Sequence, residues 1–146
     1  MKRILLVEDC SDDAELVREA FAPFKATIRL ERTSSADEAL NMLTARAARA
    51  RGLLPTCILL DMMMEPHDGM WLLHEMGRRP ELREIPVMVL SQHLAAVERA
   101  RDFPNVIGSV SKPERIAEQR RLVQDIVRLT GAMKPKKATR KPTARV

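Results

Sequence analysis

Five polar side chains that could do chemistry each stand at or just past the carboxyl end of a short apolar run. They are Glu8, Asp9, Asp61, Ser91 and Lys112. Carboxylates that are crowded together repel one another unless a cation lies between them. Ligands that are all oxygen atoms favour Mg²⁺ or Mn²⁺ over zinc. The three acidic members of the set therefore predict a divalent metal site.

Asp61 is the expected nucleophile of the set, because a carboxylate can form an acyl phosphate. The phosphoryl group needs a cation on its far side, which Lys112 can supply. The Ser91 hydroxyl can hydrogen-bond a phosphoryl oxygen and pull its own loop inward. Each of these residues alone is more often an ordinary helix start or surface turn. Their joint position at strand ends predicts a phosphoacceptor site with a switch.

The elements that position these side chains are short runs rich in Val, Ile and Leu. The runs lie at residues 4–7, 58–60, 87–90 and 106–110. Continuous apolar runs are typical of parallel strands that helices cover on both faces. Residues 27–32 instead alternate apolar and polar side chains, which predicts a strand near the edge of the sheet. Ligands of such sheets bind at the carboxyl ends of the strands, where the polar set lies.

Helical patterns separate the expected strands. A capping-box pattern at residues 35–38 opens a helix that continues to Ala47, and a similar pattern at residues 12–15 opens an earlier helix. Pro113, at an expected first-turn position, starts the last helix, which Gly131 should close.

Two more helices are expected near residues 70–77 and 93–103, and residues 46–56 form either an extra helical turn or a basic loop. The alternation of strands and helices predicts right-handed crossovers and a parallel sheet. The expected fold is therefore α/β, with a doubly wound five-stranded sheet and helices on both faces.

The composition indicates one domain in a reducing compartment. The chain has 146 residues, which suits a single domain, and two cysteines, which offer no disulfide framework. The apolar start of the chain is interrupted by Glu8 and Asp9 before it reaches signal-peptide length. No segment approaches the roughly 20 apolar residues of a membrane helix. We therefore expect a cytoplasmic protein that does not bind membranes.

The positive charge of the chain is concentrated at its carboxyl terminus. Residues 134–146 carry six Lys or Arg residues and no acid, so residues 1–133 have 19 basic and 20 acidic side chains. A segment with two prolines and no apolar periodicity is typical of disorder. We expect a folded domain at residues 1–131 and a disordered basic tail at residues 132–146.

Four segments of the sequence resemble the receiver domains of response regulators, which are switches of two-component signalling. The similarity covers about residues 2–131, and the segments are Ile4–Asp9, Leu59–Met64 with Asp68-Gly69, Ile85–Ser91 and Ser111–Pro113. The resemblance implies a flavodoxin-like sheet of strand order 2-1-3-4-5. It also implies a stand-alone, chemotaxis-regulator-like response regulator.

In functional terms, the resemblance implies that Asp61 accepts a phosphoryl group from a histidine kinase in a Mg²⁺-dependent reaction. Asp9, Asp61 and the Met63 carbonyl would bind the metal, and Glu8 would act through metal-bound water. Ser91 and Lys112 would contact the phosphoryl group. The long link before the third strand and the segment at residues 80–86 also resemble the stand-alone receivers that serve bacterial phytochrome kinases.

Three positions depart from the family pattern. Glu65 precedes Pro66 where the family has proline, Gln92 replaces a very small residue after Ser91, and Ser109 replaces an aromatic switch residue. These departures leave open an atypical or degenerate receiver that acts without phosphorylation. The intact acidic set and Lys112 favour phosphorylation.

The chain is not expected to be an enzyme acting on a free substrate, because it has no glycine-rich phosphate loop and no Ser-His-Asp arrangement. It should catalyse only its own phosphorylation and dephosphorylation. The expected output is a conformational change that a protein partner recognises, and a homodimer is compatible with the sequence. Nucleic acid is expected to bind at most weakly, through the basic tail.

Overall fold

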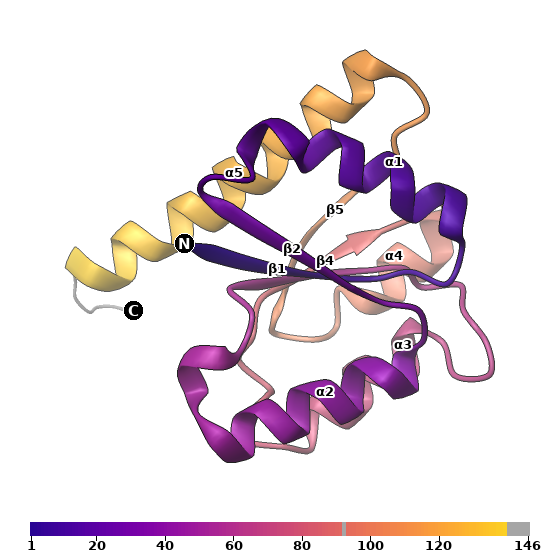
Figure 1. Ribbon diagram of the computed structural model, residues 1–146. Helices are drawn as coiled ribbons and strands as arrows, with labels where there is room; N and C mark the ends of the chain where they lie inside the picture. Colours follow the sequence, from indigo (N-terminus) through magenta and orange to yellow (C-terminus); the bar gives the residue numbers. More distant parts are fainter. Residues whose placement is uncertain (92, 140–146) are drawn as a thin grey trace.

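Five parallel strands form the central layer of the protein (Figure 1). The computed structural model describes residues 1–91 and 93–139, and residues 130–139 only as helical backbone. The strand order is β2-β1-β3-β4-β5, which confirms the predicted flavodoxin-like sheet. The strands are β1 (Lys2–Val7), β2 (Ile28–Thr33), β3 (Cys57–Leu60), β4 (Val87–Leu90) and β5 (Val106–Val110).

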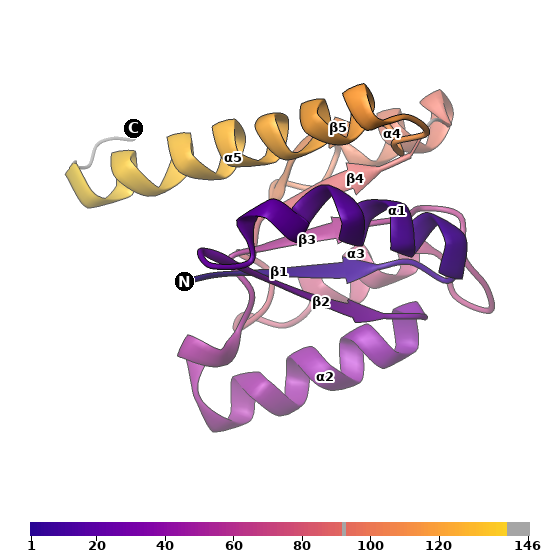
Figure 2. The same cartoon turned by 45° about the horizontal axis from the view of Figure 1, so that its top comes forward.

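Helices cover both faces of this sheet (Figure 2). They are α1 (Ser11–Phe21), α2 (Ala36–Arg49), α3 (Gly69–Gly77), α4 (Leu94–Ala100) and α5 (Ile116–Thr139). The helices α1 and α5 lie together on one face, and α2 and α3 lie on the other. A short 3-10 helix, η1 (Ala22–Phe24), follows α1, and another, η2 (Arg51–Leu53), follows α2. Of the two predictions for residues 46–56, the extra helical turn is therefore the correct one.

Two hydrophobic cores result from the alternation of side chains along the buried strands. Leu5 and Ile58 point into the core beneath α2, α3 and α4, whereas Leu6 and Leu59 point into the core beneath α1 and α5. Each is at most 1% exposed, and burial of such a side chain contributes about 1.5–3 kcal/mol. The edge strand β2 pairs only with β1 among the described residues, as its alternating pattern predicts.

The starts of two helices test the predicted capping boxes. At α2 the Ser35 hydroxyl accepts a hydrogen bond from the Glu38 amide (3.0 Å), and the Glu38 carboxylate accepts one from the Ser34 amide (2.8 Å). The predicted box at α2 is therefore confirmed. At α1 the N-cap is Cys10, without a side-chain hydrogen bond, so Asp12 lies in the first turn and does not cap the helix.

The bounds of α5 differ from the prediction at both ends. The helix begins at Ile116, so Pro113 precedes it, and it continues to Thr139, past Gly131. The described helix therefore overlaps residues 132–139 of the predicted basic tail, while residues 140–146 lie outside the described part. Extending an existing helix costs less than nucleating one, which lets α5 continue through a segment that could not start a helix by itself.

In residues 1–91 and 93–139, no helix combines the length and the apolar character that crossing a membrane requires.

Candidate functional site

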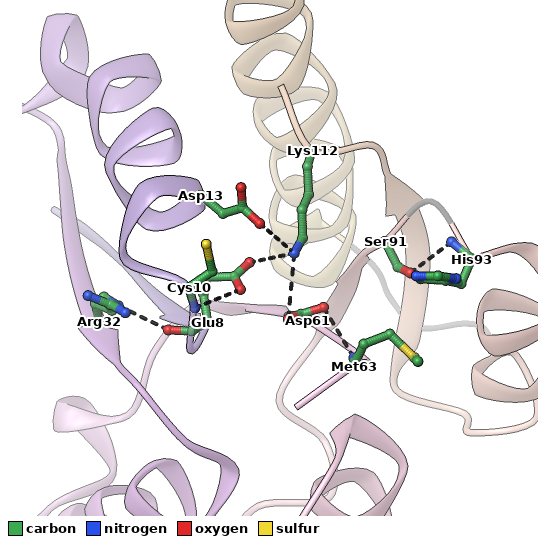
Figure 3. Close-up of polar contacts among 9 residues, drawn as sticks. All are labelled: Glu8, Cys10, Asp13, Arg32, Asp61, Met63, Ser91, His93 and Lys112. Atoms are coloured by element: carbon green, nitrogen blue, oxygen red, sulfur yellow. Dashed lines mark hydrogen bonds and ion pairs between the residues drawn. The ribbon is translucent and has the colours of Figure 1, made fainter. Parts of the chain in front are cut away.

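The parallel sheet brings the predicted polar residues to one edge. Glu8 and Asp61 directly follow β1 and β3, and Ser91 directly follows β4; all three are buried, with exposed fractions of 0%, 2% and 6%. Lys112 lies two residues past β5, and its side chain reaches toward the two carboxylates (Figure 3). The carboxyl ends of four strands thus supply the site, as expected for a doubly wound sheet.

The Lys112 ammonium is the electrostatic centre of the site. Its Nζ lies 3.0 Å from Glu8 Oε1, 3.0 Å from Asp13 Oδ2 and 3.6 Å from Asp61 Oδ2. Burial disfavours the charged ammonium and by itself would lower the pKa of Lys112. The carboxylates of Asp13 and Glu8 outweigh this effect, so the pKa is raised. Lys112 is therefore a permanent cation next to the predicted nucleophile.

Glu8 is a fully buried carboxylate with several polar neighbours. The pKa of Glu8 is raised to about 7, mainly by burial and also by the nearby Asp61, while Lys112 acts in the opposite direction. Glu8 Oε2 accepts a hydrogen bond from the Cys10 amide (3.2 Å). The Arg32 side chain donates to the Glu8 carbonyl oxygen (3.0 Å), which joins the end of β1 to β2.

A divalent cation fits the donor set of this edge. Carboxylate oxygens of Glu8, Asp9 and Asp61 all lie within 4.8 Å of one another. Glu8 Oε1 is buried without a hydrogen bond of acceptable geometry, although Lys112 lies beside it. An acidic cluster with a spare buried oxygen and an exposed member, Asp9, offers the ligands that Mg²⁺ and Mn²⁺ prefer.

A small cavity opens beside this cluster. It has a volume of about 210 Å³ and is lined by Asp61, Met63, Ser91, His93 and Lys112. Asp61 Oδ1 accepts a hydrogen bond from the Met63 amide (3.2 Å), and Ser91 Oγ accepts one from the His93 amide (3.0 Å). A carboxylate, a hydroxyl and an ammonium thus face one space.

Larger hollows exist elsewhere but contain none of these groups. Hollows of about 500 Å³ and 450 Å³ share the lining residue Phe24 and lie beside α5. Neither includes any of the five predicted polar residues in its lining. The converging charges locate the candidate site better than the size of the hollow does.

A model of the response regulator receiver domain matches residues 4–126. The chain belongs to this family. As a receiver domain of two-component systems, it carries at the edge of its sheet an acidic pocket that could bind a metal ion.

Three known proteins resemble the chain over most of its length. It is 33% identical over 124 residues to the probable methanogenesis regulatory protein FilR2 of Methanothrix harundinacea, covering 84% of this chain and 79% of FilR2. The phosphorylated cyanobacterial phytochrome response regulator RcpA superposes with a TM-score of 0.75 at 28% identity, covering 90% of this chain and 95% of RcpA. The Mn²⁺-bound response regulator Rcp1 gives a TM-score of 0.69 at 29% identity, with coverages of 87% and 92%. The resemblance to phytochrome-associated receivers noted from the sequence is confirmed.

The loop from β3 to α3 shapes one side of the receiver's pocket. Met62 and Met64 are buried in the core, whereas Met63 is 55% exposed. Two of the three consecutive methionines therefore serve packing, and the third lies on the loop surface. The loop ends at Asp68, whose carboxylate accepts a hydrogen bond from the Trp71 amide (2.9 Å) and caps α3.

The same loop is tied to α2 by His67. His67 Nδ1 lies 2.9 Å from Asp37 Oδ1, and the imidazole stacks on Trp71 with ring centroids 4.0 Å apart. The contacts of His67 are a hydrogen bond with Asp37 and a ring stack with Trp71. Trp71 is partly buried and packs against the core beneath α2, α3 and α4.

Asp13 is the site residue that sequence reasoning missed. It lies in the first turn of α1, where an aspartate is an ordinary helix-start residue. No local signal distinguished Asp13 from Asp12, because only the packing of α1 beside Lys112 decides which of the two reaches the site. Of the other positions singled out, Ser109 is exposed on β5 and Gln92 lies outside the described residues. Burial raises the pKa of Cys57 to about 12, which removes it as a nucleophile.

Proposed function

We propose that this receiver is a phosphorylation switch in which Asp61 takes a phosphoryl group from a histidine kinase and signals to a protein partner by changing shape. The observation that carries the proposal is the common cavity of Asp61, Ser91 and Lys112. A nucleophilic carboxylate, a hydrogen-bonding hydroxyl and a fixed cation are the groups that phosphoryl transfer to an aspartate requires.

In the transfer step one bond forms and one bond breaks. An Asp61 oxygen bonds to phosphorus while the bond from phosphorus to the donor's imidazole nitrogen breaks. The nitrogen leaves with the electron pair and takes up a proton from solvent. Asp61 is held for this step by the Met63 amide at Oδ1 and by Lys112 on the side of Oδ2. Water later attacks the phosphorus atom, the bond from phosphorus to the Asp61 oxygen breaks, and inorganic phosphate leaves while the carboxylate is restored.

The metal ligands in this proposal are the side chains of Glu8, Asp9 and Asp61 and the backbone carbonyl of Met63, with Glu8 acting through water. When bound, Mg²⁺ or Mn²⁺ offsets the negative charge that the carboxylates and the phosphoryl group bring together. The oxygen-rich cluster and the buried spare oxygen of Glu8 support this assignment. Rcp1, a structural relative, is known in a Mn²⁺-bound form.

Ser91 connects the phosphoryl group to α4 in this proposal. Its Oγ already accepts a hydrogen bond from the amide of His93, the residue before α4. The hydroxyl can also donate its hydrogen to a phosphoryl oxygen, since a hydroxyl can donate and accept at once. Movement of Ser91 toward the phosphoryl group would therefore pull on the start of α4. Because Ser109 carries no ring, this path does not depend on an aromatic residue on β5.

The proposed partners follow from the family and from the relatives. The phosphodonor is a histidine kinase, and the likeness to RcpA supports a phytochrome-type kinase. The receiver is proposed to act in the cytoplasm on a downstream protein, as a monomer or a homodimer. Its chemistry is limited to its own phosphorylation and dephosphorylation.

Intact mass spectrometry tests the proposal. The protein is incubated with acetyl phosphate and Mg²⁺, and the mass of one added phosphoryl group is expected in the wild type but not in Asp61→Asn. Asp102→Asn, which changes an exposed aspartate after α4, is the control and should label like the wild type. Equal labelling of wild type and Asp61→Asn, or none in either, would refute the assignment.

The tail is assigned separately. We keep the division into a receiver domain at residues 1–131 and a basic tail at residues 132–146 as a proposal. Truncation after Gly131 should leave phosphoryl uptake unchanged. If the truncated form alone lost salt-sensitive retention on DNA, the alternative of weak nucleic-acid binding through the tail would gain support.

A further inference from the structure

Lys112 is held more closely by Asp13 than by the residue it is expected to serve. The Nζ atom lies 3.0 Å from Asp13 Oδ2, with which it forms a hydrogen bond, and 3.6 Å from Asp61 Oδ2. The side chains of Lys112 and Asp13 are 23% and 33% exposed, so the pair is partly shielded from water. Figure 3 shows Asp13 approaching the ammonium from α1, on the other side from Asp61.

A phosphoryl group on Asp61 would compete for this ammonium. An ammonium has three N–H groups, and among the described residues its ion-pair partners are Glu8, Asp13 and Asp61. Glu8 is fully buried and closely surrounded, whereas Asp13 sits at the outer rim in the first turn of α1. The partner that can give way most easily is therefore Asp13.

We propose that Asp13 is a positioning residue that holds Lys112 back in the unphosphorylated state and releases it when the phosphoryl group arrives. The inference rests on the proposed phosphorylation of Asp61. Asp13 sets a threshold for activation, because every phosphoryl group that Lys112 grips must first displace this carboxylate. It also gives α1 a direct part in the switch, through a contact that joins residues 99 positions apart.

The consequence for α1 follows from its other contacts. Gln119 of α5 donates hydrogen bonds to the Leu16 carbonyl (3.4 Å) and to Glu19 Oε1 (3.3 Å), which lie on α1. These contacts with α5 lie farther along α1, whereas the contact of Asp13 with Lys112 anchors the first turn of α1. Release of Lys112 frees the end of α1 beside the pocket and leaves its middle attached to α5.

The chain offers a matched control for this residue. Asp12 is an exposed aspartate in the same first turn. Its negative charge interacts favourably with the amino end of the helix dipole, as that of Asp13 does. Asp13→Asn and Asp12→Asn therefore remove one charge each from the same end of α1. Only Asp13→Asn removes an ion-pair partner of Lys112.

The test measures the affinity of the protein for beryllofluoride, a noncovalent mimic of the phosphoryl group. The measurement uses titration calorimetry with Mg²⁺ present. Asp13→Asn is expected to bind it about three- to fivefold more tightly than the wild type, the range that loss of one partly exposed ion pair allows. Phosphorylation by acetyl phosphate should accelerate by a similar factor. Asp12→Asn should match the wild type in both measurements, and the two variants should unfold at similar temperatures.

A double-variant cycle separates the proposed role from a structural one. In a Lys112→Met background, the gain from Asp13→Asn should fall to the size of the Asp12→Asn effect, because the ammonium is gone. A gain that persists without Lys112, or an Asp13→Asn variant that equals Asp12→Asn or binds more weakly than the wild type, overturns the inference. A wild type that takes up neither beryllofluoride nor a phosphoryl group overturns the proposed function as well.

Discussion

Gly69 and Met62 approach each other so closely that no side chain fits between them. The Gly69 amide donates a hydrogen bond to the Met62 carbonyl (3.2 Å). A Cβ atom on residue 69 would lie 2.6 Å from Met62 Sδ and 2.9 Å from Met62 Cα, and 2.9 Å from the Asp61 carbonyl oxygen. The first residue of α3 thus packs directly on the backbone that carries the phosphoacceptor.

Gly69→Ala should therefore disturb both stability and phosphorylation. Overpacking of this kind costs about 1–3 kcal/mol, and the backbone of Asp61 has to shift to relieve the contact. We expect a lower unfolding free energy in urea and slower labelling by acetyl phosphate. Gly77→Ala, at the other end of α3, is the control, because a Cβ there meets nothing within 4 Å. Equal behaviour of the two variants would contradict this account.

The ion pair of Glu31 and Arg46 predicts a dependence of stability on pH. Arg46 donates to both oxygens of Glu31 (2.8 and 2.9 Å) and lowers the pKa of Glu31 below its usual 4.5. A carboxylate with a lowered folded pKa stabilises the fold above the unfolded pKa, and the stabilisation is lost as pH falls through the folded pKa. Glu31→Gln should cost about 0.5–1 kcal/mol at pH 7 and progressively less below pH ~4.5.

Denaturant unfolding at several pH values measures this difference. The matched control is Glu15→Gln, since Glu15 pairs with Arg18 at 3.5 Å with both side chains more than 60% exposed. Such an exposed pair should contribute little at any pH. A cost of Glu31→Gln that stays constant from pH 7 to pH 3 would argue against the assignment.

Metal addition and removal should change the stability of the receiver. A metal at a concentration of 100 times its Kd stabilises a folded protein by about 2.7 kcal/mol. Mg²⁺ should therefore raise the unfolding temperature, and EDTA should reverse the change. Asp9→Asn should be more stable than the wild type without metal, because it relieves repulsion with Glu8 and Asp61, and should gain less from Mg²⁺. Asp102→Asn should respond like the wild type.

His67 should control the surroundings of Trp71, the only tryptophan in the sequence. His67→Ala removes the ring stacked at 4.0 Å and the hydrogen bond with Asp37, which together should cost about 0.5–1.5 kcal/mol. The tryptophan emission should move to longer wavelength as the ring gains contact with water. Asp37→Asn keeps the stack, so its emission should equal that of the wild type. A shift in both variants would show that the contact with Asp37, and not the stack alone, protects Trp71.

The strands and the main polar site were predictable because their signals are local. A run such as residues 58–60 reads as a buried strand wherever it lies, and the alternation in residues 27–32 marked the edge strand correctly. Parallel strands end at a common edge, so Asp61 and Lys112 could be placed together without coordinates. The carboxyl end of α5 could not be predicted in this way, because a helix that has already formed can extend past a local stop signal such as Gly131.

Side-chain type and strand order were enough to predict the layered fold and the acid, hydroxyl and ammonium groups at the edge of the sheet. The partner that holds Lys112 and the anchoring of the loop after Asp61 became known only from the folded arrangement. The contacts of Asp13 with Lys112 and of His67 with Asp37 depend on how α1 and α2 are rotated against the sheet. That rotation results from the packing of whole helices, which no local pattern encodes.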